Sequence, residues 1–245
     1  LIENSNFHNN TLGFRGYGTN VAKAIFRHNV VKDNSPLGGV KADYGITVSD
    51  CEIINNSFSG DDSYYSASGL SSDRSDIKNN KIIDNTSSGV SPVYLSSGKF
   101  LNNIVSGNSV NQLPSVIAEY FDYNSYFSNN IINDNHVDFR NPQISSPITN
   151  NIFTSGISGD LKLYNNNAGF TNNSILGGSY ELVYNTENLS NVNQTILVTN
   201  NLFHGTANAI IRHKSSQSFI TTSSNNFINN ENLSFIAANN NYDSK

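Results

Sequence analysis

The chain has 245 residues, a formal net charge of −5 and only 13% charged residues, so it lacks the cationic surface on which nucleic-acid binding depends. Its longest apolar runs span only a few residues, whereas a transmembrane helix needs about 20, and no membrane span is expected. The 44 Asn and 35 Ser disfavour helix interiors because their side chains compete for backbone hydrogen bonds. The 12 Tyr and 14 Phe supply more core material than a disordered chain carries, so we expect a folded domain of strands and turns.

One short motif recurs along the chain: an apolar residue, a variable residue, an Asn pair or close variant, a variable residue and a second apolar residue. Its copies, in chain order, are IENSNF (2–7), FRHNVV (26–31), IINNSF (53–58), IKNNKI (77–82), FLNNIV (100–105), FSNNII (127–132), ITNNIF (148–153), FTNNSI (170–175), VTNNLF (198–203) and SSNNFI (223–228). From position 4 to position 225 the nine intervals average about 24.6 residues. This period, with β-branched and aromatic residues in the motif, favours stacked coils of short strands over helical repeats, which run from about 33 to 47 residues.

The spacing inside the motif predicts a corner at the Asn pair. The two apolar positions lie five residues apart, so a straight strand would send their side chains to opposite faces. Asn adopts the left-handed backbone conformation more readily than most residues, which suits it to such a corner. In stacked coils the Asn amides are expected to form a hydrogen-bonded ladder.

The residues after the motif predict a second corner and a third strand. Turn-forming residues stand five and six positions beyond the first Asn in most copies, and Gly-apolar pairs such as Gly39-Val40 and Gly69-Leu70 follow them. We therefore predict two apolar columns along one axis. The first contains Ile2, Phe26, Ile53, Ile77, Phe100, Phe127, Ile148, Phe170 and Val198; the second contains Phe7, Val31, Phe58, Ile82, Val105, Ile132, Phe153, Ile175, Phe203 and Ile228.

These patterns predict an all-β fold, a parallel β-helix of about ten coils with three short strands per coil. It forms a single domain over residues 1–245. Because neither end shows a capping element, we expect the chain to be part of a longer protein.

Segments such as FLNNIVSGN (100–108), IKNNKIIDN (77–85) and FSNNIINDN (127–135) resemble the repeats of the right-handed parallel β-helix superfamily, the pectate-lyase-like and carbohydrate-binding or sugar-hydrolase repeat proteins. The resemblance runs from Leu1 to about Asn230 and implies a right-handed single-stranded solenoid. The same repeat occurs in lyases, hydrolases, epimerases, adhesins and phage tailspikes, so it does not fix a chemistry.

Paired carboxylates in the segment Ser59-Gly60-Asp61-Asp62 look like one motif of the pectin hydrolases in that superfamily. The other pieces of that pattern, an Asn-Thr-Asp, a Gly-His-Gly and an Arg-x-Lys, are absent at plausible distances, and Asp61 falls at a turn position. The turn reading is therefore favoured. Asp61 and Asp62 remain weak candidates for binding Ca²⁺, because a hard cation needs only several oxygen ligands, and no other cofactor is expected.

Polar and aromatic residues recur in the segment before the Asn corner. The catalytic candidates are Lys41, Asp43, Asp73 and Arg74, because a polysaccharide lyase needs a base and a cation near a uronate; the candidates for binding substrate are Tyr44, Tyr94, Glu119 and Tyr120. Stacked on one side, they would form a mixed-charge groove with aromatic faces for a sugar chain. Strand alternation alone also requires solvated polar residues on an outer face.

Two functional hypotheses follow. The first is an extracellular or cell-surface module that acts as a rigid stalk or binds a polysaccharide or cell-surface glycan along one side, joined to other domains of a longer chain. Low charge with abundant Asn, Ser and Tyr suits the recognition of sugar hydroxyls by planar amides and aromatic faces. The alternative is a polysaccharide lyase, glycoside hydrolase or epimerase whose site lies on a strand face.

Overall fold

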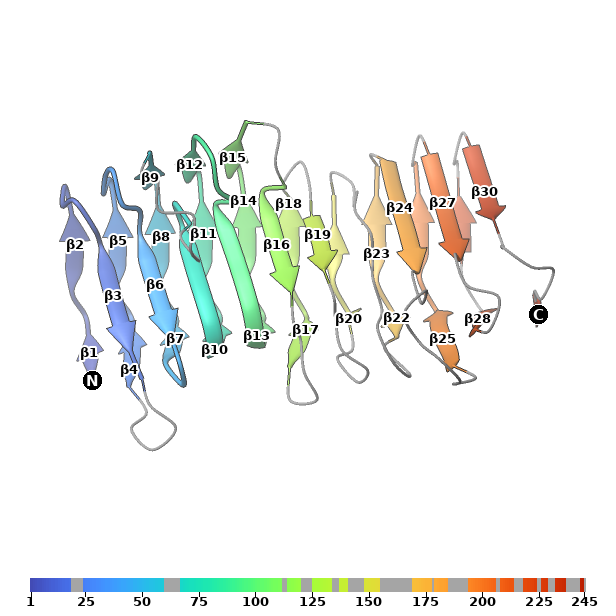
Figure 1. The fold of residues 1–245 in the computed structure, drawn as a ribbon, viewed down its shortest axis with the longest axis horizontal. Helices are drawn as coiled ribbons and strands as arrows, with labels where there is room; N and C mark the ends of the chain where they lie inside the picture. The colour runs from blue at the N-terminus through green and yellow to red at the C-terminus, as the bar shows by residue number, and fades with distance from the viewer. Residues whose placement is uncertain are drawn as a thin grey trace.

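In the computed structural model the chain winds into parallel strands that stack along one axis (Figure 1). The structure describes residues 1–18, 24–59, 67–111, 114–119, 125–133, 137–140, 148–154, 169–177, 179–184, 194–205, 208–213, 218–223, 226–228, 232–236 and 243–244. Every regular element in these ranges is a β-strand. The described residues therefore contain no apolar helix of the length needed to cross a membrane. The all-β solenoid predicted from the repeats is therefore confirmed.

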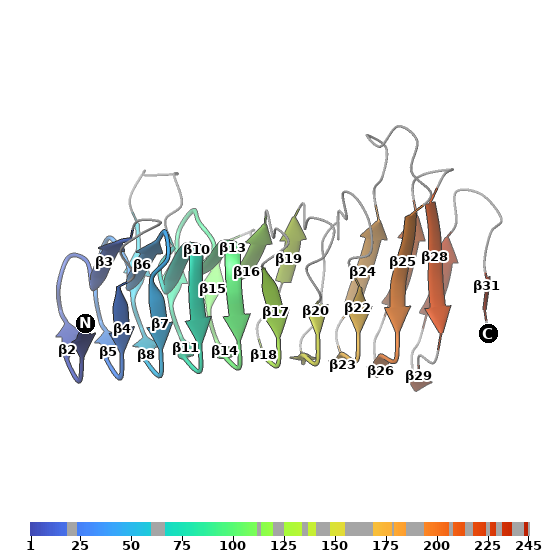
Figure 2. The same ribbon diagram turned by 90° about the horizontal axis from the view of Figure 1, so that it is seen from below.

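Face A is the sheet path that carries the first apolar column, and its strands lie side by side when the molecule is seen from below (Figure 2). In spatial order they are β1 (Ile2–Glu3), β4 (Ile25–Arg27), β7 (Thr47–Ser49), β10 (Leu70–Lys78), β13 (Val93–Leu101), β17 (Tyr126–Ser128), β20 (Ile148–Thr149), β22 (Phe170–Thr171), β25 (Gln194–Thr199), β28 (Ser218–Ser223) and β31 (Asp243–Ser244).

Face B carries the second apolar column on ten strands. They are β2 (Asn6–His8), β5 (Val30–Lys32), β8 (Glu52–Ile54), β11 (Lys81–Ile83), β14 (Ile104–Ser106), β18 (Ile131–Asn133), β21 (Ile152–Phe153), β23 (Ser174–Leu176), β26 (Leu202–His204) and β29 (Asn226–Ile228).

Face C follows face B along each coil. It consists of β3 (Phe14–Tyr17), β6 (Val40–Asp43), residues 70–73 of β10, residues 93–96 of β13, β16 (Val116–Glu119) and β19 (Val137–Arg140). Two three-stranded sheets complete the described strands: β9 (Ser57–Phe58) with β12 (Thr86–Ser87) and β15 (Ser109–Val110), and β24 (Ser179–Tyr184) with β27 (Asn208–His213) and β30 (Asn232–Ile236). Because the faces carry different numbers of strands, the predicted count of about ten coils is matched only roughly.

Side chains about two dozen residues apart do lie above one another in the core. Phe100 and Phe127 are partners in adjacent strands, and their rings stack with centroids 5.2 Å apart. The Phe153 ring continues the aromatic stack in the interior, 6.5 Å from Phe127 and 6.2 Å from Phe170. Burial of these large apolar side chains is the main contribution to stability that the fold offers, at about 1.5–3 kcal/mol each.

Three residues were assigned to the predicted columns wrongly. Val48, not Ile53, lies between Phe26 and Ile77 on face A. Ile53 belongs to the second column instead of Phe58, because it pairs with Val31 and Ile82. In the last coil Phe227, not Ile228, pairs with Phe203. The third motif copy thus belongs to the second corner of its coil, and the last copy is displaced by one residue.

The corner between faces A and B uses the two residues of the Asn pair differently. The first has a left-handed backbone with φ of 53–58°, and this set comprises Asn4, His28, Asp50, Asn79, Asn102, Asn129, Asn150, Asn172 and Asn200. The second points into the protein. In a representative coil the Oδ1 of Asn103 accepts hydrogen bonds from the backbone N–H and the Nδ2 of Asn80, at 2.9 and 3.1 Å. The predicted amide ladder is confirmed.

A second ladder follows the corner after face B. It runs through Asn10, Asn34, Asn56, Asn85 and Asn108, and from Asn34 onward each Oδ1 accepts a hydrogen bond from the backbone N–H of the residue before it in the series. Each Nδ2 from Asn34 onward also donates to a backbone carbonyl one coil earlier, as Asn85 does to Ile53 at 3.0 Å. Polar groups that would otherwise be buried without partners are thereby satisfied.

Candidate functional site

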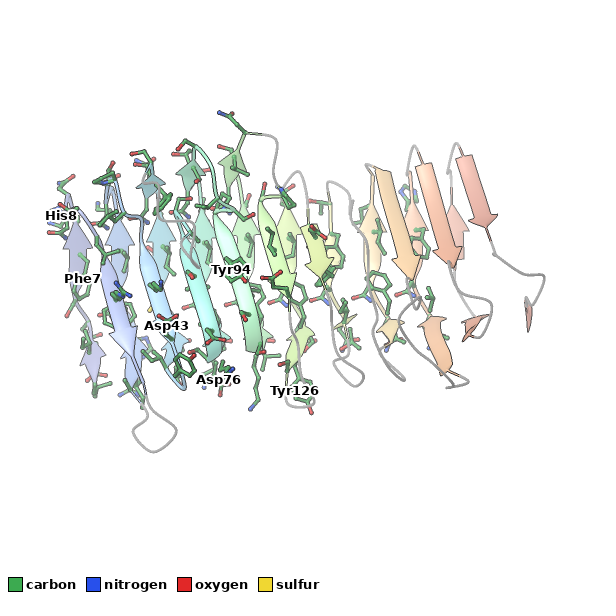
Figure 3. All side chains as sticks on the ribbon, viewed as in Figure 1. Phe7, His8, Asp43, Asp76, Tyr94 and Tyr126 are labelled. Carbon is green, nitrogen blue, oxygen red and sulfur yellow. The ribbon has the colours of Figure 1, made fainter. Side chains whose placement is uncertain are left out.

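Face C carries most of the polar residues that the sequence identifies as candidates. Along its strands the first and third side chains enter the core, as Val40 and Ala42 do on β6 and Val93 and Leu95 on β13, so the residues between them lie on the other side of the strands. Figure 3 shows Asp43 on β6 and Tyr94 on β13, on the side of the molecule turned toward the viewer.

The residues on that other side form two rows across the strands. Arg15 is exposed, five members are buried, and the remaining members, Lys41, Asp73, Tyr94 and Glu119, are half-buried. The lysine row contains Arg15, Lys41, Ser71, Tyr94, Ile117 and Asp138. The acidic row contains Asp43, Asp73, Ser96 and Glu119. The structure therefore places Lys41, Asp43, Asp73, Tyr94 and Glu119 on one face, with neighbouring strands about 4.8 Å apart.

Asp43 is the most buried carboxylate of the acidic row, with only 5% of its surface exposed. Burial raises the pKa of its carboxyl group above the usual range. Lys41 and Arg15 oppose this rise in pKa, whereas the carboxylate of Asp73, the partner of Asp43 on the next strand, adds to it. Asp43 and Asp73 are thus paired carboxylates in different environments.

Tyr94 and Glu119 connect the two rows. The Tyr94 hydroxyl donates a hydrogen bond to Oε1 of Glu119, one strand further along face C. Ile117, between them in the lysine row, is 6% exposed. This part of the face therefore presents an aromatic ring and a carboxylate in one fixed arrangement over a largely covered floor.

Arg74 and Tyr44 lie at the bend that joins face C to face A and not within either row. Both have left-handed backbones, with φ of 49° and 57°, so they form a corner of the coil and do not lie on the strand face where the sequence pattern placed them. The Arg74 guanidinium lies 5.1 Å from the centroid of the Tyr44 ring, and its Nε is 3.9 Å from Oδ1 of Asp73. They border the acidic row at its edge.

Three candidates lie outside the described residues: Tyr120, Asp61 and Asp62. Within the described ranges no group of three or more His, Cys, Asp or Glu residues is placed to hold a metal ion.

Arg15, Ser71 and Ser96 belong to the two rows but were not identified from the sequence. The sequence did contain a pattern, because each of the segments FRGY, VKAD, LSSD, VYLS and VIAE has a large apolar residue at its first position and an apolar or small residue at its third. Aligning those segments would have brought Arg15 beside Lys41. The variable loops between face B and face C hid that alignment, since the Asn motif sets the register only at the other corners.

Comparison with protein-family models, with curated proteins and with solved structures found no match for this chain. The parallel sheets and the amide ladders support the resemblance to the β-helix superfamily at the level of architecture, and nothing in the comparisons points to its pectate-lyase-like members in particular. What the structure establishes is that this chain is a parallel β-helix.

Proposed function

We propose that this β-helix is an extracellular or cell-surface module that binds a glycan chain across face C. The observation that carries the proposal is the pair of rows on face C, where the half-buried Asp73 and Glu119 lie near Tyr94 on consecutive strands. Carboxylates accept hydrogen bonds from hydroxyl groups, and tyrosine rings offer an apolar face with a polar edge. A ligand rich in hydroxyl groups matches both.

The direction of the rows supports an elongated ligand. Each row crosses the strands, so its members recur at about 4.8 Å along the long axis of the solenoid. An extended polysaccharide can contact several members of a row at once, and each contact adds to the affinity without a deep pocket. The ladders that hold the corners in register also support the rigid-stalk role, because they keep the rows straight.

Affinity electrophoresis in gels that contain acidic or neutral polysaccharides tests this proposal. We expect at least one polysaccharide to retard the native chain, and the double variant Asp73→Asn/Glu119→Gln to lose most of that retardation. Asp76→Asn is the matched control, because Asp76 lies on the same strand β10 but beyond the bend, where it faces Lys99 at 3.8 Å. Equal retardation of the native chain and the double variant would refute the proposal.

A second candidate function, glycoside hydrolysis, is favoured by the Asp43 and Asp73 pair. Retaining glycosidases use two carboxyl groups about 5–5.5 Å apart, one of them protonated, and these aspartates are direct partners on adjacent strands. The raised pKa of Asp43 suits the acid. Release of reducing ends from a bound polysaccharide, abolished by Asp43→Asn while binding persists, would establish the hydrolase; release of an unsaturated product would indicate a lyase instead.

A further inference from the structure

A small pocket lies at the lysine row, next to the N-terminal strands of face C. Its volume is about 60 Å³, and its lining is Leu12, Arg15, Leu37, Val40, Lys41, Phe58, Ala67 and Ser71. Since a single water needs roughly 10–15 Å³ on the same measure, the pocket holds a group of about four or five heavy atoms. It is too small for a sugar ring and large enough for a substituent.

The pocket has two cations at its edge. Arg15 and Lys41 are partners on the adjacent strands β3 and β6, so their side chains leave the backbone about 4.8 Å apart. Among the residues that the structure describes, neither side chain forms a salt bridge or a hydrogen bond. Both attract the buried carboxylate of Asp43 electrostatically without pairing with it. Two neighbouring like charges repel each other, and an anion between them would remove that repulsion.

The rest of the lining is mainly apolar. Five of its eight residues are Leu12, Leu37, Val40, Phe58 and Ala67, and Phe58 is 3% exposed. Water reaches this floor only at Leu12 and Leu37, because Val40, Phe58 and Ala67 are buried. A small inorganic anion would leave those two leucine side chains in contact with water. A ligand that carries a short alkyl group next to its negative charge would bury the floor and pair with the cations together.

We propose that this pocket binds a short aliphatic carboxylate, with the carboxylate group on Arg15 and Lys41 and the alkyl group against Leu12 and Leu37. A single negative charge fits best, because Asp43 follows Lys41 by two residues on β6 and its carboxylate disfavours a dianion such as phosphate. A hexuronate fits poorly, since its carboxylate is attached directly to a polar ring and leaves the floor uncovered. The ligand is either a free carboxylate or a carboxyalkyl substituent on a glycan.

Titration with propionate, followed by the methyl resonances of Leu12, Val40 and Ala67, tests the site without any glycan. We expect saturable shifts at these methyl groups with propionate, and much weaker ones with the neutral isostere 1-propanol or the cation propylamine. The variant Arg15→Gln/Lys41→Gln should weaken propionate binding by at least tenfold. Lys81→Gln is the control, because Lys81 is an exposed cation on face B that already pairs with Glu52 at 2.9 Å.

The same titration with N-acetylglucosamine that carries a 3-O-lactyl ether separates the two sources of the carboxylate. Binding of both probes at the pocket indicates a glycan substituent as the ligand, and binding of propionate alone indicates a free carboxylate. The proposal is overturned if propanol shifts the methyl groups as strongly as propionate does, if the double variant binds as well as the native chain, or if neither carboxylate binds. None of these outcomes depends on retardation by a polysaccharide, so this site and the glycan-binding face can fail separately.

Discussion

The two residues of an Asn pair have different tasks, and the difference decides what a substitution does. Asn102 is exposed and holds a left-handed backbone with φ of 58°, a conformation that Gly also adopts at little cost. Asn103 is 1% exposed and takes part in the ladder through its backbone and its amide. The Asn102 amide also donates to Oδ1 of Asn79 at 3.2 Å, but that hydrogen bond is exposed to water, so the fold depends much more on the side chain of the second residue.

Replacing Asn103 with Leu should destabilise the fold strongly. The change removes the acceptor for two donors of Asn80 and the donor that reaches the Ile77 carbonyl at 3.2 Å. Each buried polar group left without a partner costs about 1–3 kcal/mol, so we expect a loss of at least about 3 kcal/mol in the free energy of unfolding. Chemical denaturation measures it, with Asn102→Gly and Lys41→Ala as controls that should change stability by less than about 1 kcal/mol. Equal losses in all three variants would contradict the assignment of roles.

Cys51 occupies a ladder position in the coil where Asp50 makes the corner. Its backbone N–H donates to Oδ1 of Asn80 at 3.0 Å, as an Asn would, and its Sγ lies 3.7 Å from the Phe26 carbonyl that an Asn amide would bond. A thiol offers no acceptor comparable to Oδ1. Burial raises the pKa of the thiol to about 11, so Cys51 acts as a small buried side chain and not as a nucleophile.

The variant Cys51→Asn should therefore be more stable than the native chain. Its Oδ1 would accept from the backbone N–H of Asn29, and its Nδ2 would donate to the Phe26 carbonyl and to Asn80, as the equivalent atoms do in the coils around Asn103 and Asn130. We expect a gain of about 1 kcal/mol, or roughly 2–4 °C in Tm for a chain of this size. Cys51→Ser, which restores a donor but no amide, should fall below it in a thermal melt; a Cys51→Asn melt at or under that of the native chain would count against the ladder argument.

At the scale of the strands, the sequence predicts the period and the columns but not every register. Both corners next to face B use the same chemistry, a left-handed Asn or Asp followed by a buried Asn, so the pair Asn55-Asn56 was assigned to the wrong corner. The first corner of that coil is Asp50-Cys51, which the motif does not describe. The true intervals are 22 residues from His28 to Asp50 and 29 residues from Asp50 to Asn79. With Asn55 in place of Asp50 the intervals are 27 and 24 residues, which lie closer to the mean, so the wrong assignment looked more regular than the correct one.

The candidate face was harder to predict than the core. Alternation within a strand placed Lys41, Asp43 and Asp73 on an outer surface, and the register of β6 with β10 confirms that they lie together. Arg74 and Tyr44 were assigned to the same surface, but they form the bend between face C and face A and lie at its edge. The partners of the lysine row depend on which loop residues are inserted in each coil, and a repeat motif carries no information about that.

The corrected register makes a paired prediction for neighbouring residues on β8. Ile53 points into the second column and is fully buried, whereas Ile54 points outward and is half-buried. Ile53→Ala should cost about 2–5 kcal/mol of unfolding free energy because it leaves a cavity, and Ile54→Ala should cost less than about 1 kcal/mol. Urea denaturation of the two variants measures the difference. A larger loss for Ile54→Ala would mean that β8 has the opposite face in the core.

For the whole molecule, the contacts of each coil are dominated by the coil before it and the coil after it. The strand pairs on faces A and B join consecutive coils throughout the described chain, as β10 joins β7 and β13 and as β11 joins β8 and β14. Stability in such a solenoid is approximately a sum of coil terms and nearest-neighbour terms, so no single coil is indispensable. The ladders follow the same rule, because each Asn bonds only to the coils next to it.

Deletion of residues 79–101, one complete coil, should therefore leave a folded protein. Lys78 and Leu101 are partners on adjacent strands, so the deletion joins Lys78 to Asn102, a residue equivalent to the Asn79 it replaces, 23 positions away. The sheets and both ladders can close over the gap without a change of register.

Deletion of residues 79–90 removes about half a coil and would place residues of face C in the positions of face B. We expect circular dichroism and denaturation to show a cooperative β-sheet fold for the first variant, less stable than the native chain, and loss of cooperative unfolding for the second. If both deletions unfold cooperatively, coil register is not what holds the molecule together; if both are unfolded, coils are not independent units.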